Sequence, residues 1–222
     1  MKLLTDEEQK MVEAAIQKAE SMTSGEIVFA TAEASSHYHH TTIQGAVFGM
    51  AVVTAIYLLI PWLFPNTANL PYFSHNITNL LWTEFLSFAF FYAIFPRLPW
   101  RRWLISQQEM AARVHEAAFM QFYSSGLYRT RESNGVEIFL SFFERRVVVI
   151  GDRGIHEKMG DQHWENVRDL IIRGIKEGNV CAGICAAIES CGQALGQHFP
   201  HRPDDVNELP DTVIERPLDP RA

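Results

Sequence analysis

Two long apolar runs limit what this chain of 222 residues can fold into. Residues 43–64 contain no charged side chain, and their length fits a hydrocarbon core of about 30 Å at about 1.5 Å per residue. Residues 80–96 form a second run, which carries one acid, Glu84. A domain of this size could not enclose two such helices on all sides. The runs therefore predict a transmembrane helical hairpin over residues 42–96. Glu84 is expected to reach the interface at the loop end of its helix, with a functional intramembrane carboxylate as the alternative.

The charges around the hairpin predict its orientation. Arg97, Arg101 and Arg102 follow the second run, with Trp100 and Trp103 beside them, whereas the loop between the runs has no lysine or arginine. Basic residues stay on the cytoplasmic side, and tryptophans gather at membrane interfaces. We expect a multi-pass protein with both termini in the cytoplasm and the loop outside. The three cysteines, clustered in one helical stretch, fit a reducing compartment.

The rest of the sequence predicts an α/β domain with a small sheet flanked by helices. Residues 136–143 and 146–150 are rich in β-branched and aromatic residues and are separated by a loop of hairpin length. Residues 27–31 read as a further buried strand after an amphipathic helix. A helical connection between this strand and the hairpin favours parallel pairing. The α/β domain would then comprise residues 1–34 and 104–198, interrupted by the membrane hairpin, and residues 199–222 would form a loose Pro-rich acidic tail.

Composition and motifs exclude several classes of function. The net charge of −7, without a basic stripe, argues against a nucleic-acid-binding protein. The sequence has no phosphate-binding glycine loop with lysine, no nucleophile elbow and no HExxH. His37, His39 and His40 read as a polar linker, with metal binding as the alternative. The cysteines read as core residues, with zinc binding as the alternative.

The segment from Asn134 to Ile155 resembles the TPM domain family, whose members carry an NGV-type strand, a short turn, a second strand and a glycine-rich turn. The residues that match are Asn134, Gly135, Val136, Glu137, Ile138, Arg146 to Ile150, Asp152, Arg153, Gly154 and Ile155. The resemblance extends to residues 4–32 and to the helices up to about His198. It is strongest to a bacterial membrane-bound branch, which implies a location in the cytoplasmic (inner) membrane.

Several polar residues are predicted to converge at one edge of the sheet. The start of one hairpin strand lies beside the end of the next, so Glu132, Asn134 and Asp152 come together there, with Asp161 at the start of a later helix. Carboxylate and amide oxygens suit Ca²⁺ or Mg²⁺, and the resemblance implies a metal at this edge in some relatives. Ser133 stands where metal-binding relatives place an acid, which weakens the metal reading.

Basic residues offer a second interpretation of this edge, as a site for an anion such as phosphate or a lipid headgroup. Arg131 and Arg153 would hold the anion, with Arg129 nearby. The remaining alternative is that these residues form turns and cap helices, as Gly135 and Gly154 do by accepting close backbone approach.

Two functions follow from the resemblance. The first is an accessory or assembly module for a membrane complex, with a LemA-type membrane protein as an implied partner. The second is a divalent-metal-dependent, phosphatase-like hydrolase in which Glu132, Asp152 and Asp161 hold the ion; enzyme activity is implied by the resemblance alone. Gly45 and Gly49 have GxxxG spacing, which permits close helix contact and leaves a homodimer open.

Overall fold

The computed structural model describes residues 4–64, 77–156, 158, 161–202 and 207–217. The chain divides into two units, which are described separately. One unit combines Met1–His37 with Gln107–Ala222, and the other is Tyr38–Ser106. The first unit is thus formed by two stretches of sequence separated by the second.

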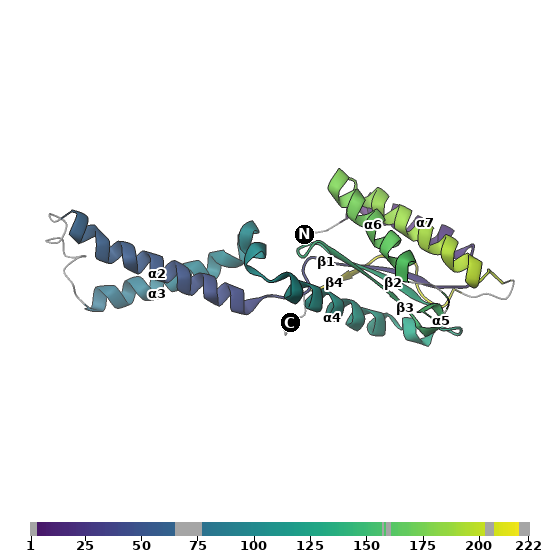
Figure 1. The fold of residues 1–222 in the computed structure, drawn as a ribbon, viewed down its shortest axis with the longest axis horizontal. Helices are drawn as coiled ribbons and strands as arrows, with labels where there is room; N and C mark the ends of the chain where they lie inside the picture. The colour runs from purple at the N-terminus through teal and green to yellow at the C-terminus, as the bar shows by residue number, and fades with distance from the viewer. Residues whose placement is uncertain (1–3, 65–76, 157, 159–160, 203–206, 218–222) are drawn as a thin grey trace. The chain divides into compact units, whose positions relative to one another are not determined.

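A four-stranded sheet forms the centre of the first unit (Figure 1). Its strands β1 (Ile27–Ala32), β2 (Val136–Ser141), β3 (Arg146–Gly151) and β4 (Ile214–Arg216) lie in the order β3-β2-β1-β4. β1 pairs in parallel with β2, and β2 pairs antiparallel with β3, as the sequence predicts. β1 and β2 are buried at every position, which agrees with strands covered on both faces, whereas the edge strand β3 is mostly half-buried.

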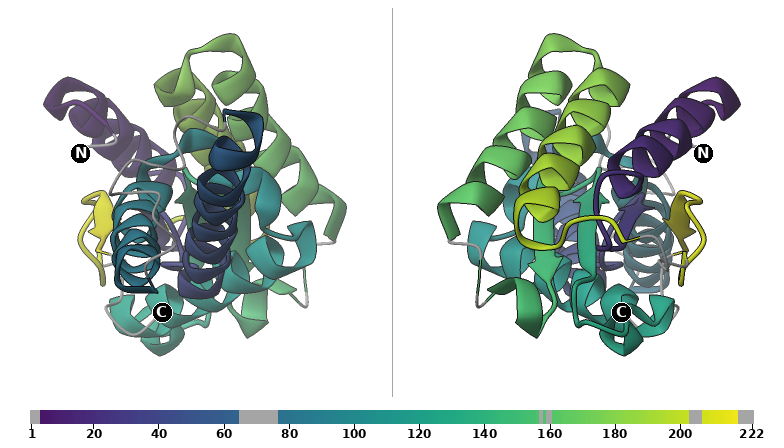
Figure 2. Two further views of the ribbon diagram at one scale, coloured as in Figure 1. Left: turned by 90° about the vertical axis from the view of Figure 1, so that its left-hand side faces the viewer. Right: turned by 90° about the vertical axis from the view of Figure 1, so that its right-hand side faces the viewer.

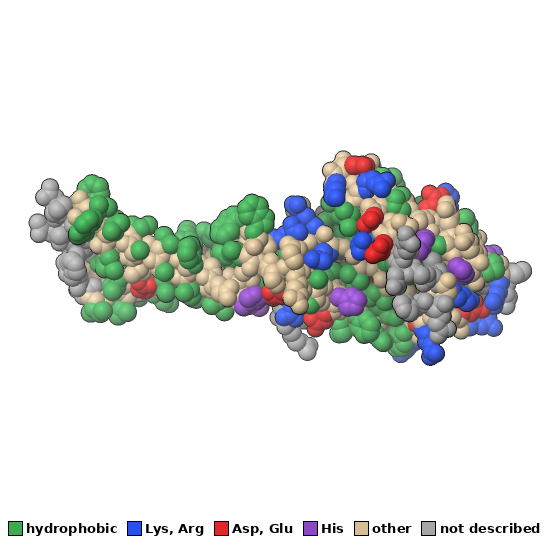
Figure 3. All heavy atoms as spheres, viewed as in Figure 1, with side chains coloured by type: hydrophobic (Ala, Val, Ile, Leu, Met, Phe, Trp, Pro, Cys, Tyr) green, Lys and Arg blue, Asp and Glu red, His purple; other side chains and the backbone are tan. Residues whose placement is uncertain are grey.

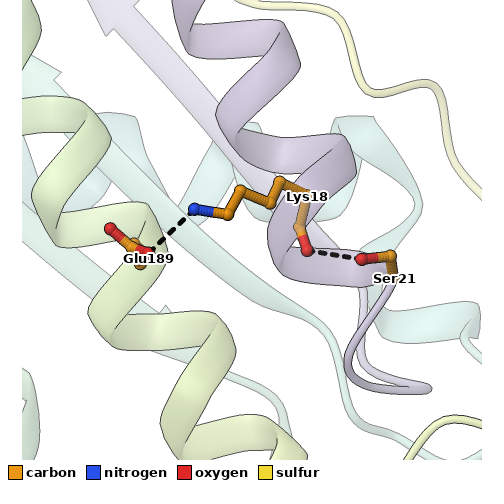
Figure 4. Close-up of polar contacts among 3 residues, drawn as sticks. All are labelled: Lys18, Ser21 and Glu189. Atoms are coloured by element: carbon orange, nitrogen blue, oxygen red, sulfur yellow. Dashed lines mark hydrogen bonds and ion pairs between the residues drawn. The ribbon is translucent and has the colours of Figure 1, made fainter.

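Helices cover both faces of this sheet (Figures 1 and 2). One face packs against α1 (Asp6–Glu20), α6 (Asp161–Glu177) and α7 (Val180–His198), and the other against α4 (Gln107–Ser125). Thr5 and Glu8 form a capping box at the start of α1. The Lys18 Nζ of α1 lies 3.0 Å from Glu189 Oε1 of α7, and Lys18 O accepts a hydrogen bond from Ser21 Oγ (Figure 4). Met110, Val114, Ala117, Ala118 and Phe122 form the buried stripe of α4.

The C-terminal segment differs from the loose tail expected from its composition. β4 extends the sheet by pairing in parallel with β1. Val213 N donates to Glu13 Oε1 at 3.4 Å, and the Arg216 guanidinium donates to the Ala117 carbonyl of α4. Leu209 and Ile214 pack into the apolar layer between the sheet and α4. The apolar contacts of Leu209 and Ile214 thus accompany an added edge strand in a segment rich in proline and acids.

The second unit contains two long helices, α2 (His39–Leu63) and α3 (Ile77–Ile94). Short 3-10 helices follow at Phe95–Arg97 and Pro99–Leu104. Both α2 and α3 are long and apolar enough to cross a membrane, and only 17 % and 6 % of their most apolar windows is buried. A helix in the core of a soluble protein would be mostly buried, so this exposure agrees with the predicted hairpin.

Glycines allow α2 and α3 to approach each other closely. A Cβ added at Gly45 would lie 2.1 Å from the Phe95 ring, and one added at Gly49 would lie 2.4 Å from the Phe91 ring. The GxxxG face is therefore occupied by aromatic side chains of the same chain. Self-association of two chains stays a prediction, and it would require a different face of the hairpin.

Candidate functional site

The turn before β2 is built by local hydrogen bonds. Asn134 is 3 % exposed; its N–H donates to Thr130 Oγ1 at 3.3 Å, and its Nδ2 donates to the Ser24 carbonyl at 2.5 Å. Ser133 has a φ of 51°, a left-handed conformation that non-glycine residues adopt rarely. A Cβ at Gly135 would lie 2.5 Å from Leu127 Cδ2. Asn134 and Gly135 therefore fix the start of β2, and their part in a binding site stays a prediction.

The turn after β3 packs directly against the turn before β2. Asp152 N donates to the Gly135 carbonyl at 2.8 Å, and Gly154 N donates to the Ser133 carbonyl at 3.1 Å. A Cβ at Gly154 would lie 2.7 Å from the Ser133 oxygen and 2.9 Å from the Glu132 oxygen, so only glycine fits. The structure thus brings the backbones of the two predicted site segments together, as the hairpin geometry requires.

The carboxylates at this edge have separate contacts. Glu132 forms an ion pair with Arg202, and Asp152 Oδ1 accepts from Arg153 N at 2.6 Å at the start of the short helix α5 (Arg153–His156). Among the described residues, no group of three or more His, Cys, Asp or Glu side chains is placed to hold a metal ion. The side chain of Asp161 lies outside the described part of the chain. The proposed Ca²⁺ or Mg²⁺ site therefore stays a prediction.

The two arginines of the anion interpretation are exposed. The backbone N–H of Arg131 donates to Glu208 Oε2 at 3.1 Å, so the C-terminal segment lies against this turn. Arg153 begins α5 with its side chain exposed. Anion binding by this pair stays a prediction as well.

An acidic pocket of about 280 Å³ lies at another edge of the same unit. It is lined by Gln17, Glu20, Ser21, Thr23, Gly25, Glu26, His201, Asn207 and Asp211. Burial raises the pKa of Glu20 to about 8; the Ile27 N–H opposes this shift, and the carboxylates of Glu26 and Asp211 add to it. Sequence reasoning missed this pocket, because Asp211 lies in the segment expected to be a loose tail.

Glu137 is a second acid that sequence reasoning passed over. It is fully buried in β2, opposite Val28 and Ile150 in the register, on the face covered by α4. Neither carboxyl oxygen has a hydrogen-bond partner among the described residues. Burial raises its pKa to about 8, and the positive charge of Arg216 opposes the shift. The sequence signal that could have identified Glu137 is that it is a lone acid inside an otherwise apolar strand.

The three cysteines of α7 lie in the hydrophobic core or pack against it. Cys181 and Cys191 are buried, Cys185 is half-buried, and all three are free thiols. Burial raises the pKa of Cys181 to about 11 and that of Cys191 to about 12, so both thiols are poor nucleophiles at neutral pH.

The fold and this edge define a mixed α/β domain with helices on both faces of a four-stranded sheet. Residues 103–194 match the family model described as the TPM domain, so the chain carries a TPM domain, as its resemblance predicted. The matched residues hold α4, the β2–β3 hairpin, α6 and most of α7. β1 and β4 lie outside the match and complete the sheet from the two flanking stretches.

A solved structure supports the fold. The NMR structure of the BA42 protein from the psychrophilic bacterium Bizionia argentinensis is similar, with a TM-score of 0.59 and 23 % identity over 97 % of each chain. At this identity the likeness concerns the fold alone. No curated protein matches the chain.

Proposed function

We propose that this chain is an integral membrane protein whose TPM domain serves as an accessory or assembly module for a membrane complex. The observation that carries the proposal is an exposed aromatic surface on the TPM domain. The two apolar helices supply the membrane anchor. Both features suit a protein that holds or presents another protein at a membrane.

The aromatic surface consists of Phe119, Met120 and Tyr123 on α4 and Tyr128 just after it. Their exposed fractions are 47, 58, 48 and 41 %. The Tyr123 ring lies 4.9 Å from the Phe119 ring and 5.3 Å from the Tyr128 ring, and the Arg129 guanidinium lies 5.1 Å from the Tyr128 centroid. Hydrophobic side chains gather over α4 in Figure 3. Clustered aromatic residues with an arginine are typical of the energetic centres of protein interfaces.

The membrane anchor is supported by the outward side chains of α2 and α3. Phe48, Trp62, Phe85 and Leu86 are at least 60 % exposed on helices without lysine or arginine. Such surfaces are stable in hydrocarbon and aggregate in water. An anchored domain is concentrated at the membrane, where its partner would be found.

The second candidate function is the metal-dependent hydrolase, and one observation favours it. Asp152 Oδ2 is buried without a hydrogen-bond partner among the described residues. A buried carboxylate oxygen of this kind is a potential ligand for a cation. Turnover separates the two functions, since an accessory module binds its partner and releases no phosphate.

The proposal is tested by removing the aromatic surface. The wild-type chain should migrate as part of a large assembly in mildly solubilised native membranes. The double variant Phe119→Ser/Tyr123→Ser should not, because two central aromatic contacts are gone. Blue native electrophoresis measures the size of the assembly. Met11→Ser, which removes another exposed side chain (52 %) from α1, is the matched control and should assemble normally. An unchanged assembly in a folded double variant would reject the α4 surface as the interface.

A further inference from the structure

Glu84 places a carboxyl group near the middle of α3, among the apolar residues of the hairpin. It is the eighth residue of α3, about 10 Å along the axis from the first residue at about 1.5 Å per residue. The described helices α2 and α3 contain no lysine or arginine that could pair with it. That Glu84 reaches the loop-side interface stays a prediction, and the intramembrane carboxylate is its alternative.

One hydrogen bond holds this carboxyl group inside the hairpin. Thr54 Oγ1 of α2 donates to Glu84 Oε1, and Thr54 also lies 2.9 Å from the Met50 carbonyl of its own helix. Among the described residues, no further hydrogen bond reaches the carboxyl group of Glu84. A carboxylate can accept about four hydrogen bonds, and a polar group in hydrocarbon is expensive unless it is satisfied. The carboxyl group of Glu84 can therefore accept further hydrogen bonds.

The Glu84 side chain lies at the border between the hairpin interface and its outer surface. It is half-buried, whereas Leu81 and Phe85 beside it are 61 and 64 % exposed. Ile77, Leu81, Glu84 and Phe88 follow one another at helical spacing and form one stripe along α3. Acidic atoms are visible among the hydrophobic side chains of the hairpin in Figure 3. We call these four residues the Glu84 stripe.

The other surface suited to helix association is already occupied. Gly45 and Gly49 receive the rings of Phe95 and Phe91, so a second chain could not use the GxxxG face without displacing them. The Glu84 stripe therefore remains as the polar recognition point of the hairpin.

We infer that the Glu84 stripe binds a transmembrane helix of a partner protein, and that this helix carries a lysine or arginine at bilayer depth. The inference rests on the proposed membrane function and names the chemistry of the partner. Charge complementarity selects this occupant, because ionisable residues inside membranes pair with one another. A second copy of this chain is disfavoured, since its described spans would bring another carboxylate and no cation.

Energy transfer in liposomes tests the inference. The full-length chain, labelled with a donor dye, is reconstituted with an acceptor-labelled leucine–alanine transmembrane peptide that has one central lysine. A peptide with leucine at the same position is the control. The lysine peptide should associate with the wild-type chain about tenfold more strongly than the leucine peptide does. In the Glu84→Gln variant, the association of the lysine peptide should fall to the level of the leucine peptide. Thr83→Val, which changes the adjacent residue and leaves the carboxyl group in place, should keep the preference.

The outcomes separate this inference from the proposed function. The inference is overturned if the integrated wild-type chain binds both peptides equally, or if the Glu84→Gln variant still prefers the lysine peptide. Either result leaves the proposed membrane function in place. A chain extracted by alkaline carbonate overturns both, because the hairpin is then not a membrane anchor.

Discussion

At the residue scale, Glu137 conflicts most with its surroundings. Its two carboxyl oxygens have no hydrogen-bond partner in the described part of the chain, and they lie in an apolar layer where burial disfavours the charged form. Sequence reasoning treated this position as part of a continuous apolar strand. The strand itself was predictable, because its neighbours are β-branched or aromatic. The burial of the acid was not, because it depends on α4 covering this face, and sequence pattern does not assign a helix to a face.

The first prediction concerns the pH dependence that Glu137 gives to stability. Its pKa is about 8 in the folded chain and about 4.5 when unfolded. Between these values the folded state binds more protons, so the free energy of unfolding falls as pH rises from 4.5 to 8. Glu137→Leu should remove the contribution of this residue to the slope. The free energy of unfolding of the variant minus that of the wild type should therefore be larger at pH 8 than at pH 5, by on the order of a few kcal/mol.

Thermal unfolding in detergent micelles, followed by near-ultraviolet circular dichroism, measures the effect. Glu20, whose pKa is also raised to about 8, remains in both proteins, so their difference isolates Glu137. A wild type and a Glu137→Leu variant with parallel stability curves from pH 5 to 8 would contradict the burial of an unpartnered carboxyl group.

At the scale of elements, sequence pattern predicted the long elements well and the short ones poorly. The predicted β2–β3 hairpin and the parallel pairing of β1 with β2 are both present. β4 was missed, because three residues carry no periodicity and their pairing with β1 is set by contacts remote in sequence. The predicted site segments do converge through Gly154, but their side chains have partners such as Arg202 and Ser24 that the sequence could not identify.

The second prediction concerns the packing of α2 against α3. Gly49→Leu should lower the stability of the hairpin by about 2 kcal/mol, since a side chain at Gly49 meets the Phe91 ring at 2.4 Å. Val47→Leu, at a 45 % exposed position of the same helix, is the control and should be nearly neutral. Intrinsic fluorescence during thermal unfolding in micelles reports both. Equal stability of the two variants would show that the GxxxG face is open. That face would then be available for the contact between two chains of a homodimer.

At the scale of the whole molecule, the sheet is assembled from three separate stretches of chain. β1 precedes α2 and α3, the β2–β3 hairpin follows them, and β4 returns from the C-terminal end. The unit that carries the TPM domain is therefore complete only when both flanks of the apolar hairpin fold together. The interruption was predictable from two runs without basic residues, whereas the aromatic surface of α4 became visible only once one face of that helix was packed on the sheet.

The central claim is that α2 and α3 anchor the chain in a membrane with both ends in the cytoplasm. The most direct measurement is alkaline carbonate extraction of bacterial membranes that hold the full-length chain, combined with protease digestion of a C-terminal epitope. We expect the chain to resist extraction, and the epitope to be digested in inverted vesicles but not in intact spheroplasts. Release of the chain by carbonate, or digestion of the epitope from outside, would contradict the claim.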